Sequence, residues 1–312
     1  MFEFSQSNII QPLPVSSETA SKDIELSIKR EDLIHPVISG NKFRKLYYNI
    51  QEAKRSNNDT LLTFGGAYSN HILATAGAGA HYGLKTVGVI RGDELGVNLS
   101  KTLANNMTLQ RANNFGMQFK FVSRADYQNK DSEQIHNKLL NEFPNAYLIP
   151  EGGTNDLAIK GCREILSTET DNFDYICVSM GTGGTLSGIV QQAKPYQMVL
   201  GFPALKAKGF EKYVIQGEKF KDNWKLIDAY HFGGYAKITK ELVTFINEFK
   251  ANTNIPLDPV YTGKTMFGVY DLLANDFFPA KSKILVIHTG GLQGISGMNS
   301  ILQKRGWPLI NV

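Results

Sequence analysis

The sequence is poor in cysteine: its 312 residues include only two, Cys162 and Cys177. They lack the paired spacing of zinc ligands, and no cluster of histidine, cysteine and carboxylate residues suggests another metal, so no metal is expected. Cys177 lies in the apolar run "YICVSM" and is expected to be a small buried side chain. Such sparse use of cysteine favours a reducing, cytoplasmic setting.

Runs of like charge and long apolar runs are also missing. The 33 basic and 29 acidic residues give a net charge of +4, which is too even to imply nucleic acid as a partner. No stretch of about 18 apolar residues occurs, so no membrane span is expected. The opening "MFEFSQSNIIQPLPV" carries an early acid and too short an apolar run for a signal peptide. What is left is a globular chain, long enough for one large or two modest domains.

Short apolar runs alternate with helical patterns along the chain. The first series predicts strands at 60–64, 85–92, 117–123 and 146–150, and helices at 72–83, 99–116 and 131–142. The second predicts strands at 174–180 and 198–205, a strand plus turn at 283–291, and helices at 186–193 and 293–303. This rhythm is typical of parallel sheets with helices on both faces. We therefore predict an α/β protein of two doubly wound open-sheet domains, a smaller one at 46–153 inserted into a larger one made of 1–45 and 154–312.

The strongest local signal is "SMGTGGTLSG", residues 179–188. A strand leads into a glycine-rich turn and then a helix, so backbone N–H groups and the helix dipole can face an anion, with Thr182 and Thr185 as further donors. The spacing is neither Walker A nor G-x-G-x-x-G, which favours one phosphate over a triphosphate or a dinucleotide. An ordinary strand-to-helix turn explains the same letters, and the motif alone does not decide.

A second glycine turn, "FGGAYSNH" at 64–71, repeats this arrangement. Ser69 and Asn70 are preferred helix N-caps, and by itself that structural role is the better interpretation. Ligands of α/β proteins bind at the carboxyl ends of strands, which keeps this turn as a candidate site.

Two later segments also end in turns: "DPVYTGKTMFG" at 258–268 and "VIHTGG" at 286–291. Taken alone, Tyr261 is expected to be a packing residue and His288 a hydrogen-bonded core histidine. No G-x-S-x-G elbow occurs, so a serine hydrolase is not expected.

Lys42 lies in "SGNKFRKL", residues 39–46. A lysine amine is nucleophilic only when deprotonated, and burial or nearby cations favour that state. Taken alone, "KFRK" predicts a solvated helix start. With a one-phosphate site elsewhere, Lys42 instead suggests pyridoxal 5′-phosphate (PLP), with a Schiff base at Lys42 and the phosphate at "GTGGT".

Six motifs occur in order along nearly the whole chain: "KREDL…SGNKFRKL", "FGGAYSNH", "IPEGGTN", "GTGGTLSG", "DPVYTGK" and "IHTGG". Together they resemble the 1-aminocyclopropane-1-carboxylate (ACC) deaminase/D-cysteine desulfhydrase family of PLP-dependent enzymes. The resemblance implies the tryptophan synthase β-subunit-like fold (fold type II), a small amino-acid substrate and a homodimer.

The resemblance also implies roles by position. Lys42 matches the lysine that holds PLP, Asn70 the residue that bonds the cofactor's 3′-oxygen, and Thr262 the residue that faces the pyridine nitrogen. Ser69 matches a substrate-carboxylate contact and possible proton carrier, and Tyr261 and, with altered spacing, Tyr235 match active-site tyrosines. The phosphate cradle is matched by Gly181, Thr182, Gly183, Gly184 and Thr185. Tyr68, Ser69, Asn70 and His71 are the expected substrate-binding residues.

Thr262 has a chemical consequence. In the ACC deaminase branch this position is typically glutamate, which can keep the pyridine nitrogen protonated. A threonine hydroxyl supplies no charge, so the ring is expected to be a weaker electron sink, suited to β-elimination rather than to opening a cyclopropane. His71 and "HTGG" also resemble the desulfhydrase branch. The expected activity is a carbon-sulfur lyase of the D-cysteine desulfhydrase type, giving pyruvate, ammonia and sulfide, with Lys42, Ser69 or Tyr261 as the base at Cα.

Two departures bear on the substrate. Tyr68 replaces the glutamine usual before "SNH", and the stretch 292–295 in "GGLQGI" replaces a more apolar and aromatic one. Both are expected to change the pocket. Three further functions therefore stay open: an ACC deaminase, a lyase or deaminase acting on another D-amino acid, and a non-catalytic protein that binds a phosphate ligand.

Overall fold

The computed structural model describes residues 9–206, 209–214 and 222–312; residues 1–8, the start of the stretch considered above as a signal peptide, lie outside the described residues. The chain forms two compact units. Unit 1 comprises the described parts of Met1–His35, Ser39–Asn41 and Cys162–Val312, and unit 2 comprises Pro36–Ile38 and Lys42–Gly161. The inserted domain predicted at 46–153 stays a prediction, because compactness alone does not show that a segment folds by itself.

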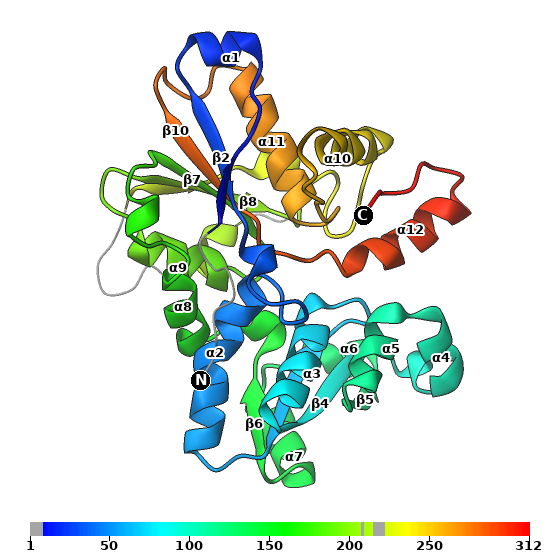
Figure 1. Ribbon diagram of the computed structural model, residues 1–312. Helices are drawn as coiled ribbons and strands as arrows, with labels where there is room; N and C mark the ends of the chain where they lie inside the picture. Colours follow the sequence, from blue (N-terminus) through cyan, green and yellow to red (C-terminus); the bar gives the residue numbers. More distant parts are fainter. Residues whose placement is uncertain (1–8, 207–208, 215–221) are drawn as a thin grey trace. The chain divides into compact units, whose positions relative to one another are not determined.

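Unit 1 is built on a six-stranded sheet in the order β1-β2-β10-β7-β8-β9 (Figure 1). Its strands are β1 (Ile10–Pro12), β2 (Glu25–Lys29), β7 (Tyr175–Met180), β8 (Met198–Pro203), β9 (Trp224–Leu226) and β10 (Lys283–Ile287). Neighbours run parallel except β1, which is antiparallel to β2. A parallel strand buried on both faces needs a nearly continuous apolar sequence, and "YICVSM" gives β7 that sequence.

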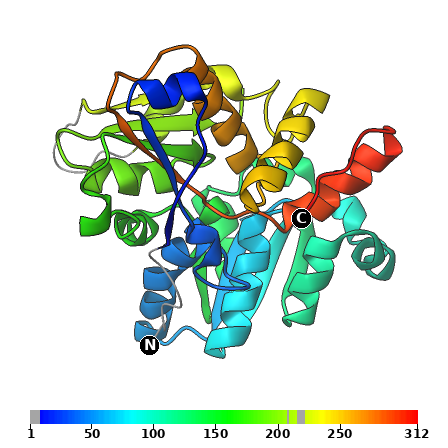
Figure 2. The same ribbon diagram turned by 45° about the horizontal axis from the view of Figure 1, so that its top comes forward.

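Helices cover both faces of this sheet. They are α1 (Ser17–Ser21), α9 (Gly184–Gln192), α10 (Lys240–Thr253), α11 (Thr262–Ala274) and α12 (Gly294–Lys304), while α8 (Asp156–Arg163) passes from unit 2 into unit 1. Successive side chains of a strand point to opposite faces. Cys177 of β7 therefore packs in the core that includes residues of α10, α11 and α12, whereas its neighbours Ile176 and Val178 pack in the core that includes α9. Figure 2 shows α9 and the pair α10 and α11 on opposite sides of the strands.

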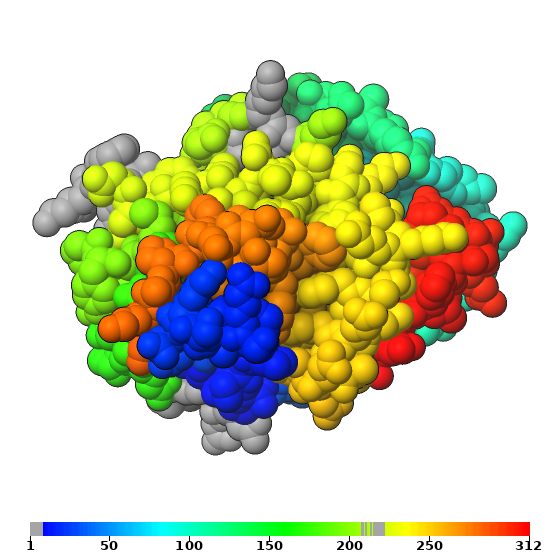
Figure 3. Space-filling view, turned by 90° about the horizontal axis from the view of Figure 1, so that it is seen from above, coloured from blue at the N-terminus to red at the C-terminus, as the bar shows by residue number. Residues whose placement is uncertain are grey.

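The short helix α1 is joined to the far end of α11. The ammonium group of Lys22 pairs with the carboxylate of Asp276, and the Lys281 N–H donates to the Lys22 carbonyl over 2.8 Å. In Figure 3 the N-terminal segment, in blue, lies directly against the orange segment that contains α11 and the turn after it. These contacts join the segment after α1 to the segment between α11 and β10, which is more than 250 positions later in the chain.

Unit 2 is built on a four-stranded parallel sheet in the order β5-β4-β3-β6. Its strands are β3 (Thr60–Gly65), β4 (Lys85–Arg91), β5 (Gln118–Val122) and β6 (Ala146–Ile149). Its helices are α2 (Asn41–Arg55), α3 (Asn70–Tyr82), α4 (Leu99–Asn105), α5 (Met107–Asn114), α6 (Arg124–Gln128) and α7 (Glu133–Glu142), and a 3₁₀ turn, η3 (Glu151–Gly153), follows β6. Phe64 packs with Leu139 of α7 in one core, and Ile90 packs with Ile72 of α3 in another. No helix among the described residues is long and apolar enough to cross a membrane.

The predicted α/β class with parallel sheets is confirmed, and all seven predicted strands are present. Two helix predictions were wrong in detail. The helix expected over 99–116 is two helices, because Asn106 leaves the helical conformation and its side chain caps α5 by accepting from the Leu109 N–H at 2.9 Å. The helix expected from residue 186 begins at Gly184, so the last two residues of "GTGGT" belong to α9. Strands β1, β2 and β9 and helices α1, α6, α8 and α10 had no prediction.

Candidate active site

The carboxyl ends of β7 and β10 meet at one edge of the unit 1 sheet. The two strands are parallel neighbours, with Ile287 opposite Val178. The turns that follow them therefore lie side by side, and the hydroxyl groups of Ser179 and Thr289 are 3.0 Å apart. This is the edge at which parallel α/β sheets bind ligands.

The glycine turn, Gly181–Thr185, opens α9 at this edge. Gly183 has φ +85°, a conformation that side chains strongly disfavour, and it is the N-cap of the helix. As a glycine, this N-cap has no side chain with which to cap the helix, and the buried Thr185 is the second helical residue. The first N–H groups of a helix need acceptors. A start with no side-chain cap is the arrangement expected where an anion supplies them.

The segment 39–41 is fixed to the turn after β10. Gly40 has φ +62°, and a Cβ atom there would lie 2.0 Å from the Thr289 carbonyl oxygen. The Asn41 N–H donates to that same oxygen over 3.3 Å, and its side-chain amide donates to the Thr185 hydroxyl over 2.8 Å. The first residue of α2 is therefore held by both turns, and Lys42 is the next residue of that helix.

Asp258 organises the start of α11. Its buried carboxylate accepts the N–H groups of Val260, Tyr261 and Thr262 at 2.7–2.9 Å, and it also accepts the Thr262 hydroxyl proton at 2.8 Å. In return, the Asp258 N–H donates to the Thr262 hydroxyl oxygen over 2.9 Å. The helix dipole stabilises a carboxylate at this position, so Asp258 fixes the backbone at Tyr261 and both the backbone and the hydroxyl of Thr262.

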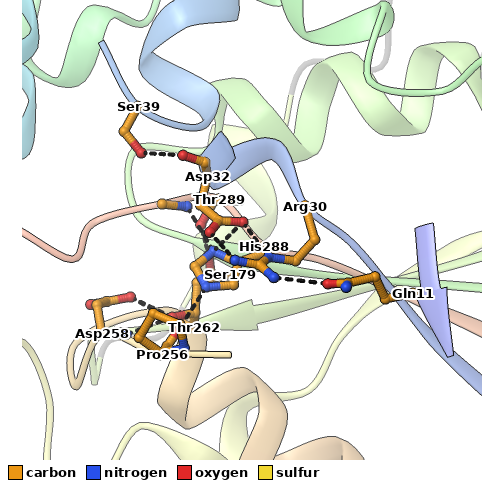
Figure 4. A network of polar contacts seen from close by, with 11 residues as sticks. Gln11, Arg30, Asp32, Ser39, Ser179, Pro256, Asp258, Thr262, His288 and Thr289 are labelled. Carbon is orange, nitrogen blue, oxygen red and sulfur yellow. Dashed lines mark hydrogen bonds and ion pairs between the residues drawn. The ribbon is translucent and has the colours of Figure 1, made fainter. Parts of the chain in front are cut away.

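A buried ion pair supports the same edge from β2 (Figure 4). Arg30 donates to both oxygens of Asp32, at 2.8 and 2.7 Å, and His288 Nδ1 lies 3.5 Å from that carboxylate. His288 Nε2 donates to the Pro256 carbonyl, whereas Nδ1 accepts from the Gly290 N–H, and these contacts specify the neutral Nε2–H form. His288 is thus the hydrogen-bonded core histidine that the sequence predicted.

The two predicted tyrosines lie together in unit 1. Their rings are 6.3 Å apart in an edge-to-face arrangement, and a Cβ atom on Gly181 would be 3.3 Å from the Tyr261 ring. Lys264 of α11 holds the loop before Tyr235, because its ammonium group donates to the carbonyls of His231 and Gly234 at 2.9 and 2.8 Å. Burial lowers the pKa of Lys264 to about 8, and the charge of Asp258 opposes that shift.

In unit 2, the motif "YSNH" forms the start of α3. Ser69 is the N-cap, and its hydroxyl oxygen accepts from the Ile72 N–H at 3.4 Å, as the structural interpretation of this turn predicted. Asn70 is the first helical residue, and Tyr68, at 52% exposed, points to solvent. A Cβ atom on Gly65 would lie 2.9 Å from the Ser69 hydroxyl, which explains the glycine at the end of β3.

His71 is fully buried beneath η3. The Thr63 hydroxyl donates to the Ile149 carbonyl and so accepts from His71 Nε2, at 2.9 Å, which leaves Nδ1 as a buried acceptor with no hydrogen-bond partner in the described structure. Burial, with the positive charges of Lys42 and Lys45, lowers the pKa of His71 well below its usual 6.5. His71 is therefore a neutral imidazole, and the positive charge of Lys42 helps to keep it unprotonated.

The prediction of a solvated "KFRK" helix start was wrong. Arg44 and Lys45 are 4% and 2% exposed. Lys45 donates to the Gly152 carbonyl over 2.9 Å and to the Thr154 hydroxyl over 3.0 Å. Its ammonium group therefore links α2 to η3 within unit 2. A buried ammonium requires such partners.

The structure thus gathers the predicted site residues in two groups. Unit 1 holds the glycine turn, Tyr235, Tyr261 and Thr262; unit 2 holds Lys42 and the four residues 68–71. No group of three potential metal-binding side chains occurs in the described ranges. Cys162 and Cys177 are buried, and burial raises the pKa of the Cys177 thiol, which disfavours its reactive thiolate form.

Sequence reasoning missed Asp258, Asp32, Arg30 and Lys264. Asp258 had a signal, since an acid four residues before Thr262 is placed to cap a helix start. Arg30 and Asp32 lie only two residues apart, but Asp32 also faces His288, and Lys264 bonds the carbonyls of residues 231 and 234, so these contacts involve segments distant in the chain.

Residues 6–290 match the family described as pyridoxal-phosphate dependent enzyme. The chain belongs to this family of PLP-dependent enzymes. The chain is 33% identical to a bifunctional D-cysteine desulfhydrase/1-aminocyclopropane-1-carboxylate deaminase, mitochondrial, from Arabidopsis thaliana, over 87% of this chain and 73% of that protein. It is 32% identical to a putative 1-aminocyclopropane-1-carboxylate deaminase from Pyrococcus horikoshii, over 91% of this chain and 89% of that protein.

The fold agrees with a solved structure described as an ACC deaminase homologue, with a TM-score of 0.80 and 29% identity, covering 96% of this chain and 94% of that one. The predicted ACC deaminase/D-cysteine desulfhydrase family, fold type II and PLP as cofactor are therefore confirmed.

The residues present fit PLP. The N-cap of α9 is a glycine without a capping side chain, which suits a phosphate, and the Thr262 hydroxyl is bonded to Asp258 at the start of α11. Lys42 supplies a primary amine one residue after the hydrogen bond that ties α2 to the glycine turn. The roles of the individual residues toward the cofactor remain predictions.

Proposed function

We propose that this PLP-dependent enzyme is a carbon-sulfur lyase that removes the β-substituent of a D-amino acid, with D-cysteine or a close analogue as substrate and pyruvate, ammonia and sulfide as products. The observation that carries this proposal is the residue at position 262. Its side chain is a threonine hydroxyl, without formal charge, whose proton is donated to Asp258. A neutral group at the pyridine nitrogen suits loss of a good leaving group better than cleavage of a cyclopropane.

Four parts of the chain hold the cofactor in this proposal. Lys42 is the covalent attachment point, the glycine turn with its N–H groups and the dipole of α9 binds the phosphate, Asn70 bonds the 3′-oxygen, and Thr262 contacts the pyridine nitrogen. PLP, when bound, supplies the electron sink that accepts the pair left at Cα. The protein's own task is to orient the amino acid and to move protons.

Three groups remain as the base at Cα: the Lys42 amine, the Ser69 hydroxyl and the Tyr261 hydroxyl. Ser69 uses one lone pair for the Ile72 N–H and keeps its own proton for donation, which suits a contact to the substrate carboxylate. The backbone at Tyr261 is held by Asp258, which accepts the Tyr261 N–H at 2.9 Å. The Lys42 amine can take the proton only in its deprotonated state, and the neutral His71 neither donates a charge to it nor competes with it as a cation.

Substrate choice is assigned to Tyr68, Ser69, Asn70, His71 and Tyr235. Tyr68 and Tyr235 are 52% and 49% exposed, so both rings can contact a ligand, whereas His71 is buried and acts through its neighbours. In the stretch 292–295, Ile295 packs in the core of unit 1. The departures from the family pattern therefore bear on substrate choice mainly through Tyr68.

A substrate panel tests the proposal. Purified protein loaded with PLP is incubated with D-cysteine, L-cysteine, β-chloro-D-alanine and ACC, and pyruvate and 2-oxobutyrate are measured separately. We expect pyruvate and sulfide from D-cysteine and pyruvate from β-chloro-D-alanine. Product from ACC alone, as 2-oxobutyrate, would identify the protein as an ACC deaminase instead.

Two further results of the same panel would point elsewhere. Pyruvate from β-chloro-D-alanine without turnover of D-cysteine would indicate a lyase for another D-amino acid. A protein that stays colourless with added PLP and turns over none of the four compounds would support a non-catalytic phosphate-binding role. The expected homodimer and the cytoplasmic setting remain predictions, which size-exclusion chromatography and cell fractionation would test.

A further inference from the structure

We propose that Asp258 is a positioning residue that turns the Thr262 hydroxyl into a pure hydrogen-bond acceptor, so that Thr262 holds a proton on the pyridine nitrogen of the cofactor. This inference rests on the proposed function, which places Thr262 at that nitrogen. It changes the role expected of Thr262 from sequence, where the hydroxyl was considered alone.

In the structure, the Thr262 hydroxyl already uses its proton and one of its lone pairs on Asp258. A hydroxyl group has one proton to donate and two lone pairs to accept. The proton goes to Asp258 Oδ1 over 2.8 Å, and one lone pair takes the Asp258 N–H over 2.9 Å. One lone pair remains, so any further partner of this hydroxyl must be a donor. A pyridine nitrogen is a donor only when it carries a proton.

Asp258 cannot exchange roles with Thr262. As an ionised carboxylate it is acceptor-only, and its two oxygens already take three backbone N–H groups that can only donate. Those groups belong to the start of α11, so turning the carboxylate away would leave a buried helix start without its cap. The Asp258 carboxylate is therefore held in place by the backbone of α11, and it offers Oδ1 to the Thr262 hydroxyl with or without a ligand.

The other polar side chains near Asp258 and Thr262 direct their hydrogen bonds to other groups. The Lys264 ammonium interacts with Asp258 but spends its hydrogen bonds on the carbonyls of His231 and Gly234. His288 donates to the Pro256 carbonyl, two residues before Asp258, as a neutral imidazole. The Asp258 carboxylate is thus the anionic group bonded to Thr262, and its charge acts on a proton held by the Thr262 oxygen.

This arrangement differs in strength from a directly bonded glutamate. A neutral oxygen backed by a carboxylate holds a proton less firmly than a carboxylate in contact, because charge-assisted hydrogen bonds are the stronger ones. The proposed preference for elimination requires only that the proton on the pyridine nitrogen is held less firmly than it would be by glutamate. The ring remains a weaker sink than one facing glutamate, yet a better one than a ring facing a hydroxyl that donates.

The ¹⁵N NMR resonance of the pyridine nitrogen tests the inference. The holoenzyme is prepared with PLP labelled at that nitrogen and measured at neutral pH. We expect wild type and Thr262→Ser to show the shift of a protonated pyridine, since both keep the hydroxyl. Asp258→Asn and Thr262→Val are expected to move the resonance toward that of unprotonated pyridine. Asp271→Asn, a carboxylate change on α11 that affects only the bond from the Tyr230 hydroxyl, is the matched control and should leave it unchanged.

Each result of this NMR experiment either supports the inference or overturns it. An unprotonated resonance in wild type, or a protonated one in both Asp258→Asn and Thr262→Val, would overturn the inference. If Asp258→Asn does not fold, as judged by circular dichroism, Thr262→Val and wild type carry the test, because valine keeps the shape of threonine and leaves the helix cap in place. The substrate panel fails or succeeds independently: a protonated nitrogen with product from ACC alone would reject the proposed substrate and keep the role of Asp258.

Discussion

The side-chain amide of Asn41 donates to the hydroxyl of Thr185 over 2.8 Å, which ties the first residue of α2 to the second residue of α9. Lys42 follows Asn41, and Thr185 closes the glycine turn. The residue that precedes the proposed Schiff-base lysine is therefore bonded to the proposed phosphate site. This contact connects two motifs that lie 144 positions apart in the chain.

Replacing Lys42 by alanine is expected to remove the covalent link to PLP. The variant should lose the absorption of the bound cofactor and the pyridoxyl adduct that borohydride fixes in wild type, and its rate of pyruvate formation should fall by at least about 100-fold if the amine is also the base. Mass spectrometry of a digest and a pyruvate assay measure both. Lys54→Ala, an exposed lysine on the same helix, is the control and should retain the adduct. An adduct that survives in Lys42→Ala would show that another lysine holds the cofactor.

Gly40→Ala is expected to destabilise unit 1 and to weaken PLP binding. The new Cβ atom would lie 2.0 Å from the Thr289 carbonyl oxygen, in addition to the cost of about 1–2 kcal/mol for a side chain at positive φ. Gly306→Ala separates the two effects, because Gly306 has φ +63° and nothing lies within 4 Å of its added Cβ. Thermal unfolding and cofactor titration should show a clearly larger loss for Gly40→Ala. Equal losses would mean that the segment 39–41 moves away from Thr289 at little cost.

His71 makes stability depend on pH in a defined direction. Its pKa is lowered in the folded state, so below about 6.5 the unfolded chain binds a proton that the folded chain does not. Stability therefore falls as pH decreases below 6.5 and is unaffected by this group above that value. His71→Gln, which can still donate to Thr63, should reduce the difference in melting temperature between about pH 7.5 and about pH 5.5. His81→Gln, on the exposed end of α3, is the control. A wild-type slope that persists in His71→Gln would assign it to other groups.

The buried pair of Arg30 and Asp32 is expected to be essential for folding of unit 1. Arg30→Met leaves the Asp32 carboxylate buried without its two donors, and removing one partner of a buried pair costs about 3–5 kcal/mol. Arg55→Met breaks a surface pair with Glu52 and should cost nothing measurable. Urea unfolding of the two variants makes the comparison. Similar midpoints would show that water reaches Asp32 readily once Arg30 is removed.

The sequence by itself determined those features that depend on local order along the chain. Alternating apolar runs located seven strands, glycine turns marked the carboxyl ends of strands in each sheet, and the ordered motifs indicated a PLP-dependent family. Each of these is written in consecutive residues, because a strand, a turn or a helix start is set by the backbone preferences of its own letters.

Only the tertiary structure decided which side chains are buried and what they bond. "KFRK" predicts a solvated helix start, yet Arg44 and Lys45 are buried, because Lys45 finds acceptors at Gly152 and Thr154 more than a hundred positions later. The positive φ of Gly40 is needed because of Thr289, and His71 is neutral because Thr63 and η3 enclose it. Hydrogen bonds and desolvation depend on distance in space, and a single chain does not reveal which distant residues meet until its sheets are assembled.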